Sequence, residues 1–423
     1  MDKMLHNTDI ISSIDIGTTK VTALIVELQD IDTIKVLGFG ISNSDGLKKG
    51  IVVDIHKTTK AIRDAVSQAE AQADCQIEDA FVGLTGEHIK GINYSGVITI
   101  NKNNNRQPIG QEIVKNDIDR VVEHAQSINI SPDRKILHVL NQSYKVDSRD
   151  GIKNPLGLSG HRLEAKVHLV TSALNVENDI KTCLSNANIN VSSFVLEPLA
   201  SSYAVLDKNE RDLGVVLIDI GGGTTDVIVY KDSGVMHAGS IPIGGKNITS
   251  DIAYGLQISL EQAEKLKCSH GIAKMSLANK EPDLVIAGMS GRDSKNISQF
   301  DLAEIIEPRV DEIFKLAKNE INKSNCQNDN TFGIVLTGGG AQLEYIKDLA
   351  QYIFQQNIKI GIPNITCELS EKLTNPRYST GVGLINYAIE YLNEPGCNLP
   401  GPSINSIFSD FMKNLKKLFN KWY

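Results

Sequence analysis

A short glycine-rich phrase occurs twice in this chain and constrains its fold more than any other feature. The first copy reads Ile14-Asp-Ile-Gly-Thr-Thr-Lys-Val21, and the second reads Ile218-Asp-Ile-Gly-Gly-Gly-Thr-Thr-Asp-Val227. Apolar runs flank each copy, so each predicts a tight turn between two buried strands. When the Thr-Thr pairs are aligned, the second copy has two inserted glycines, and Lys20 falls where the second copy has Asp226.

The two turns have the chemistry of phosphate sites. Glycines let backbone N–H groups approach a ligand closely, and a concave turn of such groups suits phosphate oxygens. The threonine hydroxyls add donors, and an aspartate near the end of the preceding strand can hold a metal ion through water. For one copy alone, a glycine-rich hairpin with an incidental aspartate is the alternative. Two copies, with Asp15 and Asp219 about 200 residues apart, predict a duplicated two-lobed body with a nucleotide between the lobes.

Composition and charge exclude several classes of protein. The chain has 423 residues, enough for more than one domain, and its net charge of −8 argues against a general nucleic-acid binder. Its 6 cysteines are scattered without a Cys-x-x-Cys pair, which is typical of reduced thiols rather than of a disulfide framework or a zinc site. We find no apolar secretory leader and no run long enough to span a bilayer. We therefore expect a cytosolic protein, unless a separate segment brings it to a membrane.

The two turns resemble the two phosphate loops of the superfamily that contains actin, the heat-shock chaperones and the sugar kinases. Residues 332–343 predict a strand, a glycine turn and a helix, and they resemble its adenosine motif, although any α/β crossover has this pattern. Residues 376–384 resemble its second connection between lobes, whose glycines would allow two helices to pack closely. Glu197 begins a predicted helix and resembles the residue that orients the attacking water, but the helix dipole alone would favour a glutamate there.

The same resemblance implies a set of ligand contacts. Glu264 and Lys267 share one face of a predicted helix, and by resemblance they would contact the ribose and base of adenosine; as a local feature, a surface ion pair is the alternative. ATP and Mg²⁺ would lie between the lobes, with at most weak hydrolysis, since no strong base is evident beside Glu197. The metal would face Asp15 and Asp219. The residues expected to contact the nucleotide are Gly17, Thr18, Thr19, Lys20, Gly221, Gly222, Gly223, Thr224, Thr225, Asp226, Glu264, Lys267, Gly338, Gly339 and Gly340.

A small α/β module is expected at residues 85–163, inserted into the first lobe. Three phrases in and beside it are Asn154-Pro-Leu-Gly157, Gly160-His-Arg-Leu-Glu164 and Val167-His-Leu169. They closely resemble the corresponding phrases of the FtsA family of bacterial division proteins. Actin and the chaperones carry no such module at this place, so the resemblance selects this branch of the superfamily.

The end of the chain has the pattern of a membrane tether. Residues 393–402 are rich in proline and glycine and predict a linker. Within 403–423 apolar residues recur at helical spacing, and lysines with a single acid, Asp410, occupy the other side. A basic amphipathic helix on an acidic body predicts binding to an anionic membrane, and a terminal helix docked on its own domain is the alternative. The residues expected at the membrane are Phe408, Phe411, Lys413, Leu415, Lys416, Lys417, Phe419, Lys421 and Trp422.

Over nearly its whole length the chain is therefore similar to the FtsA family. The resemblance implies an α/β, actin-like two-lobed ATPase fold with duplicated ribonuclease H-like lobes, an inserted small α/β subdomain and a C-terminal amphipathic helix. It implies an ATP-binding protein that self-associates, tethers the tubulin-like FtsZ ring to the cytoplasmic face of the plasma (inner) membrane at the division site, and recruits later division proteins. The expected divisions are 1–84 and 164–200 for the first lobe core, 85–163 for the inserted subdomain, 201–245 and 310–392 for the second lobe core, 246–309 for a capping subdomain, 393–402 for the linker and 403–423 for the membrane helix.

Two other functions fit parts of the pattern. A small-molecule kinase of the sugar type shares the phosphate loops, but it needs a catalytic carboxylate and a substrate pocket and has no use for a membrane tail. A pilus-type actin-like adaptor shares the inserted module, and the amphipathic tail argues against it. A chaperone is disfavoured because no peptide-binding β domain follows the ATPase body.

Overall fold

The computed structural model describes residues 10–30, 33–100, 111–286, 294–324, 326, 332–365 and 370–393. These residues form two compact units. The first unit combines residues 10–84, 178–205 and 362–393, and the second combines Thr85–Glu177 with Leu206–Gly361.

The first unit is built on a five-stranded sheet of order β13-β6-β1-β2-β3. Its first three strands form an antiparallel meander, and β6 and β13 add parallel strands. Helix α1 packs closely on β3 because Gly40 has no side chain: a Cβ there would lie 1.8 Å from the carbonyl oxygen of Ala65. The elements are β1 (Ile10–Ile16), β2 (Lys20–Asp30), β3 (Thr33–Asn43), β4 (Leu47–Lys48), β5 (Ile51–Val52), α1 (Ile55–Ala73), β6 (Asp79–Leu84), α3 (Leu174–Asn186), β13 (Asn190–Leu196), α4 (Glu197–Val205), α10 (Ser370–Leu373) and α11 (Ser379–Asn393).

The second unit contains a sheet with the same plan, of order β16-β15-β14-β19-β20. Again an antiparallel meander of three strands is extended by two parallel strands, and again the glycine phrase joins the first two strands of the meander. The repeated strand order confirms the predicted duplication. The elements are α5 (Lys208–Leu213), β14 (Val215–Ile220), β15 (Thr225–Lys231), β16 (Gly234–Ile241), α6 (Gly245–Leu256), α7 (Leu260–His270), β17 (Leu284–Ile286), β18 (Lys295–Ile297), α8 (Gln299–Asn322), β19 (Ile334–Thr337), α9 (Ile346–Phe354) and β20 (Ile358–Ile360).

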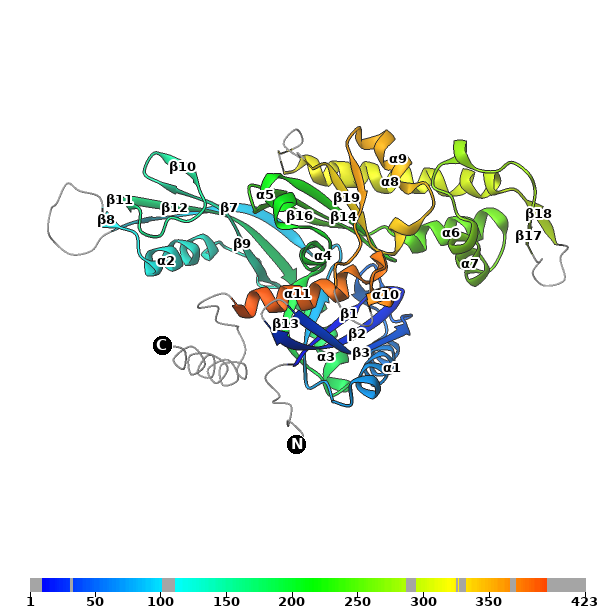
Figure 1. Cartoon of the computed structure of the whole chain (residues 1–423), viewed down its shortest axis with the longest axis horizontal. Helices are drawn as coiled ribbons and strands as arrows, with labels where there is room; N and C mark the ends of the chain where they lie inside the picture. The colour runs from blue at the N-terminus through cyan, green and yellow to red at the C-terminus, as the bar shows by residue number, and fades with distance from the viewer. Residues whose placement is uncertain are drawn as a thin grey trace. The chain divides into compact units, whose positions relative to one another are not determined.

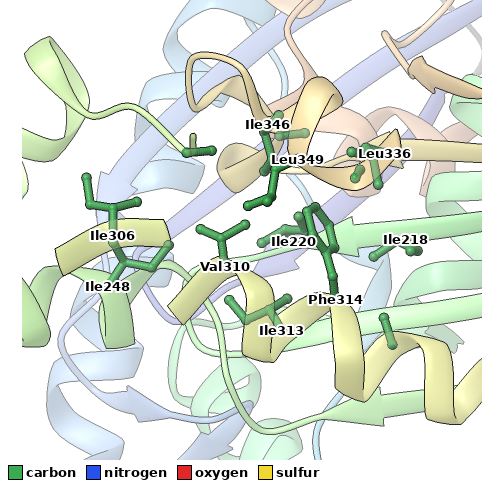
Figure 2. Packing of buried hydrophobic residues seen from close by; sticks show 14 of the residues in the cluster. Ile218, Ile220, Ile248, Ile306, Val310, Ile313, Phe314, Leu336, Ile346 and Leu349 are labelled. Carbon is green, nitrogen blue, oxygen red and sulfur yellow. The ribbon is translucent and has the colours of Figure 1, made fainter. Parts of the chain in front are cut away.

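The core of this second sheet is formed against helix α8. Ser298 caps the helix, and its hydroxyl accepts a hydrogen bond from the Asp301 N–H. Val310 and Phe314 lie on the buried face of α8, beside Ile220 of β14 (Figure 2). Removing these side chains from water stabilises the strands that carry the second glycine turn, at about 1.5–3 kcal/mol for each large apolar side chain.

The inserted domain has its own four-stranded sheet, of order β10-β9-β12-β7, with helix α2 along one face (Figure 1). Gly96 of β7 lets α2 approach, since a Cβ there would lie 2.4 Å from the carbonyl oxygen of Val121. In chain order the domain follows β6, but its residues group with the second unit. We expected the module to end at residue 163, but its last strand continues to Ala173. The strand is this long because its pairing with β9 extends as far as Arg134. The elements are β7 (Lys90–Thr99), β8 (Gln111–Glu112), α2 (Lys115–Gln126), β9 (Arg134–Val146), β10 (Arg149–Ile152), β11 (Ser159–Gly160) and β12 (Arg162–Ala173).

The described part of the chain has no membrane-spanning helix, and its cysteines form no disulfide. Its helices include none with the length and hydropathy that crossing a membrane requires. Its cysteines, Cys75, Cys183, Cys268 and Cys326, are free thiols.

His168 joins the inserted domain to β16. Its Nε2 accepts a hydrogen bond from the Ala238 N–H at 3.1 Å, and its Nδ1 lies 2.6 Å from Asn93 Oδ1. Because Nε2 accepts, the proton of the neutral ring is on Nδ1, which donates to Asn93. Burial lowers the pKa of His168 to about 4, and the nearby His237 acts in the same direction. The joint therefore requires the neutral ring.

Acid should weaken the fold through buried histidines of this domain. Burial lowers the pKa of His168, His88 and His138 to about 4. An unfolded histidine has a pKa of about 6.5, so between these values the unfolded chain binds more protons than the folded chain. The free energy of unfolding should therefore fall as the pH falls from about 6.5 to 4, by up to about 1.4 kcal/mol per pH unit for each such histidine.

The variant His168→Gln tests this expectation. Glutamine keeps an oxygen that can accept the Ala238 N–H, but it cannot gain a proton. In urea unfolding of the full chain at several pH values from about 7 to 4, the variant should lose stability less steeply than the unchanged protein. His161→Gln is the control, because the His161 side chain is 62% exposed, and it should keep the original slope. Equal slopes for all three proteins would contradict the expectation.

Candidate functional site

The first glycine phrase forms the turn between β1 and β2. The Gly17 N–H donates to the Lys20 carbonyl at 2.9 Å and closes the turn, and Asp15 pairs with Thr22 just before it. The Lys20 amine lies 3.2 Å from the Asp15 carboxylate and 5.3 Å from the centre of the Tyr378 ring. The predicted metal residue and the predicted phosphate lysine of this hairpin therefore form an ion pair, which is largely buried.

The second glycine phrase forms the corresponding turn between β14 and β15. The Gly221 N–H donates to the Thr224 carbonyl at 2.9 Å, and Asp219 pairs with Asp226 just before the turn. The Thr225 hydroxyl donates to the Ile243 carbonyl at 2.8 Å, which fixes the turn against the chain that follows β16.

Strand pairing shows that the two hairpins have equal length. Asp15 pairs with Thr22 and Asp219 pairs with Asp226, and both pairs enclose the same number of residues. The prediction of two inserted glycines, which set Lys20 opposite Asp226, is wrong. That alignment superposed the Thr-Thr pairs because their residue types are identical. The register of the two strands is set by backbone hydrogen bonds and not by the threonine hydroxyls. The residue equivalent to Asp226 is Thr22.

A row of polar side chains crosses the second sheet at Asp219. Asp219 lies between Asp226 on β15 and Thr337 on β19, and Asp226 lies beside Ser240 on β16. Residues directly opposite one another in a sheet point to the same face. Burial raises the pKa of Asp226 to about 7, and the Asp219 carboxylate acts in the same direction. Two adjacent buried carboxylates create a place where a cation is favoured.

The predicted adenosine turn packs directly on this row. Gly338 has a φ of 84°, and a Cβ there would lie 2.2 Å from Asp219 Oδ1. A Cβ on Gly340 would lie 2.4 Å from the Ile220 side chain. The parallel pairing of β14 with β19 brings these distant segments together. Glycines are required here because the backbone lies against Asp219 at Gly338 and against Ile220 at Gly340.

The predicted adenosine ion pair lies beside the second glycine turn. Lys267 donates to Glu264 Oε2 at 2.7 Å and to the Gly245 carbonyl at 3.1 Å. The Gly245 N–H donates to the Gly221 carbonyl at 2.9 Å. The Lys267 side chain is 13% exposed and the Glu264 side chain is 45% exposed, so the pair is anchored to the hairpin through its lysine.

In the first unit, Glu197 begins α4 and lies against β6. A Cβ on Gly83 would lie 3.1 Å from Glu197 Cγ. In the parallel pairing of β6 with β1, Val82 lies opposite Ile14, so Gly83 is level with Asp15. Glu197, which lies against Gly83, is therefore one strand away from Asp15. The predicted close packing of helices is confirmed, because a Cβ on Gly383 of α11 would lie 1.9 Å from the carbonyl oxygen of Ala200 in α4.

The structure therefore brings the predicted residues together within each unit. The second unit gathers Asp219, Asp226, the glycines of both turns and the Glu264–Lys267 pair. The first unit gathers Asp15 and Lys20 beside residues 376–384. That the two hairpins share one ligand stays a prediction. The predicted membrane residues and the linker lie outside the described residues.

Two relevant residues gave no signal that we recognised in the sequence. The Thr85 hydroxyl donates to Asp226 Oδ1 at 2.5 Å across 141 residues of chain, a separation that no local pattern can reveal. Within the described residues, Thr22 has a buried hydroxyl without a hydrogen-bond partner. An alignment by strand register would have found Thr22, since it is the equivalent of Asp226.

Comparison with known families agrees with this geometry. The family model "Cell division protein FtsA" matches residues 216–383, and the model "SHS2 domain inserted in FTSA" matches residues 86–171. The chain is 40% identical over 380 residues to the cell division protein FtsA of Pseudomonas aeruginosa, covering 90% of this chain and 89% of the relative. The chain belongs to the FtsA family. The FtsA of Neisseria meningitidis is 38% identical over 398 residues, covering 94% of this chain and 93% of the relative.

Solved structures support the actin-like fold of this FtsA family member. A structure described as the PilM-PilN type IV pilus biogenesis complex has a TM-score of 0.63 at 15% identity and covers 91% of this chain and 99% of that one. MreB5 of Spiroplasma citri bound to ADP has a TM-score of 0.53 at 14% identity, with coverages of 91% and 99%. Identities this low establish the fold alone, so the pilus likeness does not support the pilus-type alternative.

Substitution of Gly338 should disrupt this site in a measurable way. Gly338→Ala combines a left-handed backbone with a collision at Asp219, and we expect it to lower the free energy of unfolding by about 3 kcal/mol or more. Gly151→Ala is the matched control, since Gly151 has a φ of 73° and nothing within 4 Å of the added Cβ. It should cost only about 1 kcal/mol. Denaturant unfolding compares the two, and equal losses would contradict close packing on Asp219.

Proposed function

We propose that this FtsA family member binds ATP with Mg²⁺, self-associates, and tethers the FtsZ ring to the cytoplasmic face of the plasma membrane. The observation that carries the nucleotide part is the buried Asp219–Asp226 pair, framed by two glycine turns and by the Glu264–Lys267 pair. The FtsZ and membrane parts rest on membership of the division family and on the composition of residues 403–423.

The second unit fits a nucleotide. Glycine turns at 221–223 and 338–340 bring backbone close to one region, as phosphate and adenosine require. Solved structures of the actin-like protein MreB5 of Spiroplasma citri are described as bound to ADP and to AMPPNP, with TM-scores of 0.53 and 0.52. The same type of ligand suits the donors collected here.

The carboxylates suit magnesium better than a metal ion whose ligands all come from protein side chains. Within the described ranges we find no cluster of three or more His, Cys, Asp or Glu side chains that could hold a metal ion. Magnesium is usually held by one or two carboxylates, phosphate oxygens and water. Asp219 and Asp15 would supply such oxygens, and the bound metal would neutralise phosphate charge.

The residues of the chain have distinct roles in this proposal. Lys20 and the threonines at 18, 19, 224 and 225 bind phosphate, while Glu197 orients a water. Glu197 begins α4 and is the only residue that the sequence suggests for orienting the attacking water. We therefore expect ATP hydrolysis to be slow. Nucleotide binding mainly favours one shape of the protein, and that shape favours self-association.

The tail sets the strength of membrane binding. Each lysine near an anionic leaflet contributes up to ~1 kcal/mol, and each large apolar residue contributes ~1.5–3 kcal/mol when fully buried. Ordering the tail costs ~1 kcal/mol or more per residue. One tail should therefore bind reversibly, whereas many tails on one assembly bind persistently through their effective concentration. We assign FtsZ contact to the capping subdomain at 246–309, and contacts with neighbouring copies and later division proteins to the inserted domain.

The variant Asp219→Ala tests the nucleotide part. It should weaken Mg²⁺-dependent binding of a fluorescent ATP analogue by at least about 100-fold, because the buried carboxylate that faces the metal is gone. Asp150→Ala is the control, since Asp150 forms an exposed ion pair with Lys166 in the inserted domain. Unchanged affinity in Asp219→Ala would contradict the assignment. Rapid phosphorylation of a sugar or small acid would instead support the kinase alternative.

Deletion of residues 403–423 tests the tether. The shortened chain should bind nucleotide within about twofold of the full chain but should no longer pellet with anionic vesicles. A full-length chain with glutamine at Lys413, Lys416, Lys417 and Lys421 separates charge from apolar burial, and it should bind anionic vesicles more weakly. FtsZ should reach the vesicles only with the full chain. Equal pelleting without the tail would contradict the tether.

A further inference from the structure

The first residue of the inserted domain contacts the phosphate hairpin of the second unit. Thr85 directly follows Leu84, the last residue of β6, and it is 7% exposed. Its hydroxyl donates to Asp226 Oδ1 at 2.5 Å and lies 3.1 Å from the Ser240 hydroxyl. A residue outside every predicted motif thus contacts the carboxylate next to Asp219.

Asp226 depends on such donors. It is 2% exposed and lies beside the Asp219 carboxylate. An ionised carboxylate can only accept hydrogen bonds, and a buried one that loses a donor loses most of the compensation for its burial. The Thr224 hydroxyl donates to Oδ2 at 3.3 Å, so the Thr85 bond is the shorter of these two. The orientation of Asp226 is therefore set partly by the inserted domain.

The segment after Thr85 is held firmly to the rest of the inserted domain. Arg134 at the start of β9 donates to the His88 carbonyl at 2.6 Å and to the Thr171 carbonyl at 2.8 Å. The Ile89 N–H donates to the Gly86 carbonyl at 3.0 Å. One guanidinium thus fixes the entry and the exit of the domain, so a displacement of Thr85 must move both.

A second set of contacts joins the inserted domain to β16. The Gln142 amide donates to the Val235 carbonyl at 2.9 Å, and His168 accepts from the Ala238 N–H at 3.1 Å. The same strand continues to Ser240, beside Asp226. The inserted domain therefore contacts the hairpin strands at both the far end of β16 and the carboxylate row.

We propose that Thr85 is a positioning residue of the nucleotide site, and that its bond to Asp226 couples metal–nucleotide occupancy of the second hairpin to the inserted domain. This inference rests on the proposed function, because it takes the ligand beside Asp219 to be a metal-bound nucleotide. The bond orients the Asp226 carboxylate beside Asp219, so a cation bound there would find the carboxylate already positioned. Binding free energies are coupled reciprocally. If the ligand changes the strength of the Thr85–Asp226 bond, a shift of the inserted domain that changes this bond also changes the affinity for the ligand.

The experiment compares Thr85→Val, Thr85→Ser and Ser240→Ala in the full chain. The first removes the hydroxyl at nearly constant volume, the second keeps it, and the third removes a different hydroxyl beside Asp226, from a residue of β16. Binding of a fluorescent ATP analogue is measured with Mg²⁺ and with a chelator. Hydrogen exchange of residues 86–90 and 168–173 is measured with and without the Mg²⁺–nucleotide.

We expect Thr85→Val to bind the Mg²⁺–nucleotide about tenfold more weakly, with little change in the chelator, and Thr85→Ser to stay within about twofold of the unchanged protein. Nucleotide should alter exchange at 86–90 and 168–173 in the unchanged protein and in Ser240→Ala, but not in Thr85→Val. Ser240→Ala keeps the test decisive if the valine variant does not fold, because an absent exchange response in a folded Ser240→Ala protein overturns the coupling through Thr85.

Other outcomes separate this inference from the proposed function. Unchanged Mg²⁺–nucleotide affinity in a folded Thr85→Val protein overturns the inference alone. Equal loss in the serine and valine variants also overturns it, since it would indicate packing and not the hydroxyl. Absence of nucleotide binding in the unchanged protein overturns the proposed function itself.

Discussion

The pairing of β14 with strands on both sides is the constraint on which the site depends. It sets Asp219 between Asp226 and Thr337, on one face of the sheet and away from water. Burial away from water raises the pKa of Asp226 to about 7, and repulsion by the adjacent Asp219 carboxylate acts in the same direction. The arrangement is costly unless hydroxyl donors, and in our proposal a metal-bound nucleotide, compensate for it. Gly338, which lies against Asp219, and the hydroxyl of Thr85, which donates to Asp226, both contact this pair directly.

Duplication gave two lobes with the same plan but different hairpins. The two turns have equal length and the same closing hydrogen bond, so their backbones offer the same geometry. The first hairpin carries Lys20, which pairs with Asp15, and has a threonine at the position of Asp226. The second has a second carboxylate and no lysine in its turn. In our proposal, this asymmetry would place extra positive charge beside phosphate at the first hairpin and extra negative charge beside the metal at the second.

The joint between the inserted domain and the second sheet is polar. It includes hydrogen bonds donated by Gln142 and Thr85, one accepted by His168, and an edge contact between the His168 and His237 rings, while the apolar core of the inserted domain is formed within that domain. These directional contacts hold the inserted domain against the second sheet, while the two hydrophobic cores stay separate. A joint so built can respond to the ionisation of His168 or to events at Asp226, while each core stays intact.

The sequence by itself predicted the two glycine hairpins, the duplicated lobes and the inserted module, all of which the structure contains, whereas the basic amphipathic tail lies outside the described residues and stays a prediction. Each is a local pattern of residue types, and such patterns follow from turn geometry, strand periodicity and charge. It could not determine that Thr22 is the counterpart of Asp226, that Lys20 pairs with Asp15, or that Thr85 holds Asp226. Only the tertiary structure decided these, because strand register and contacts between distant segments arise from the packing of the whole chain.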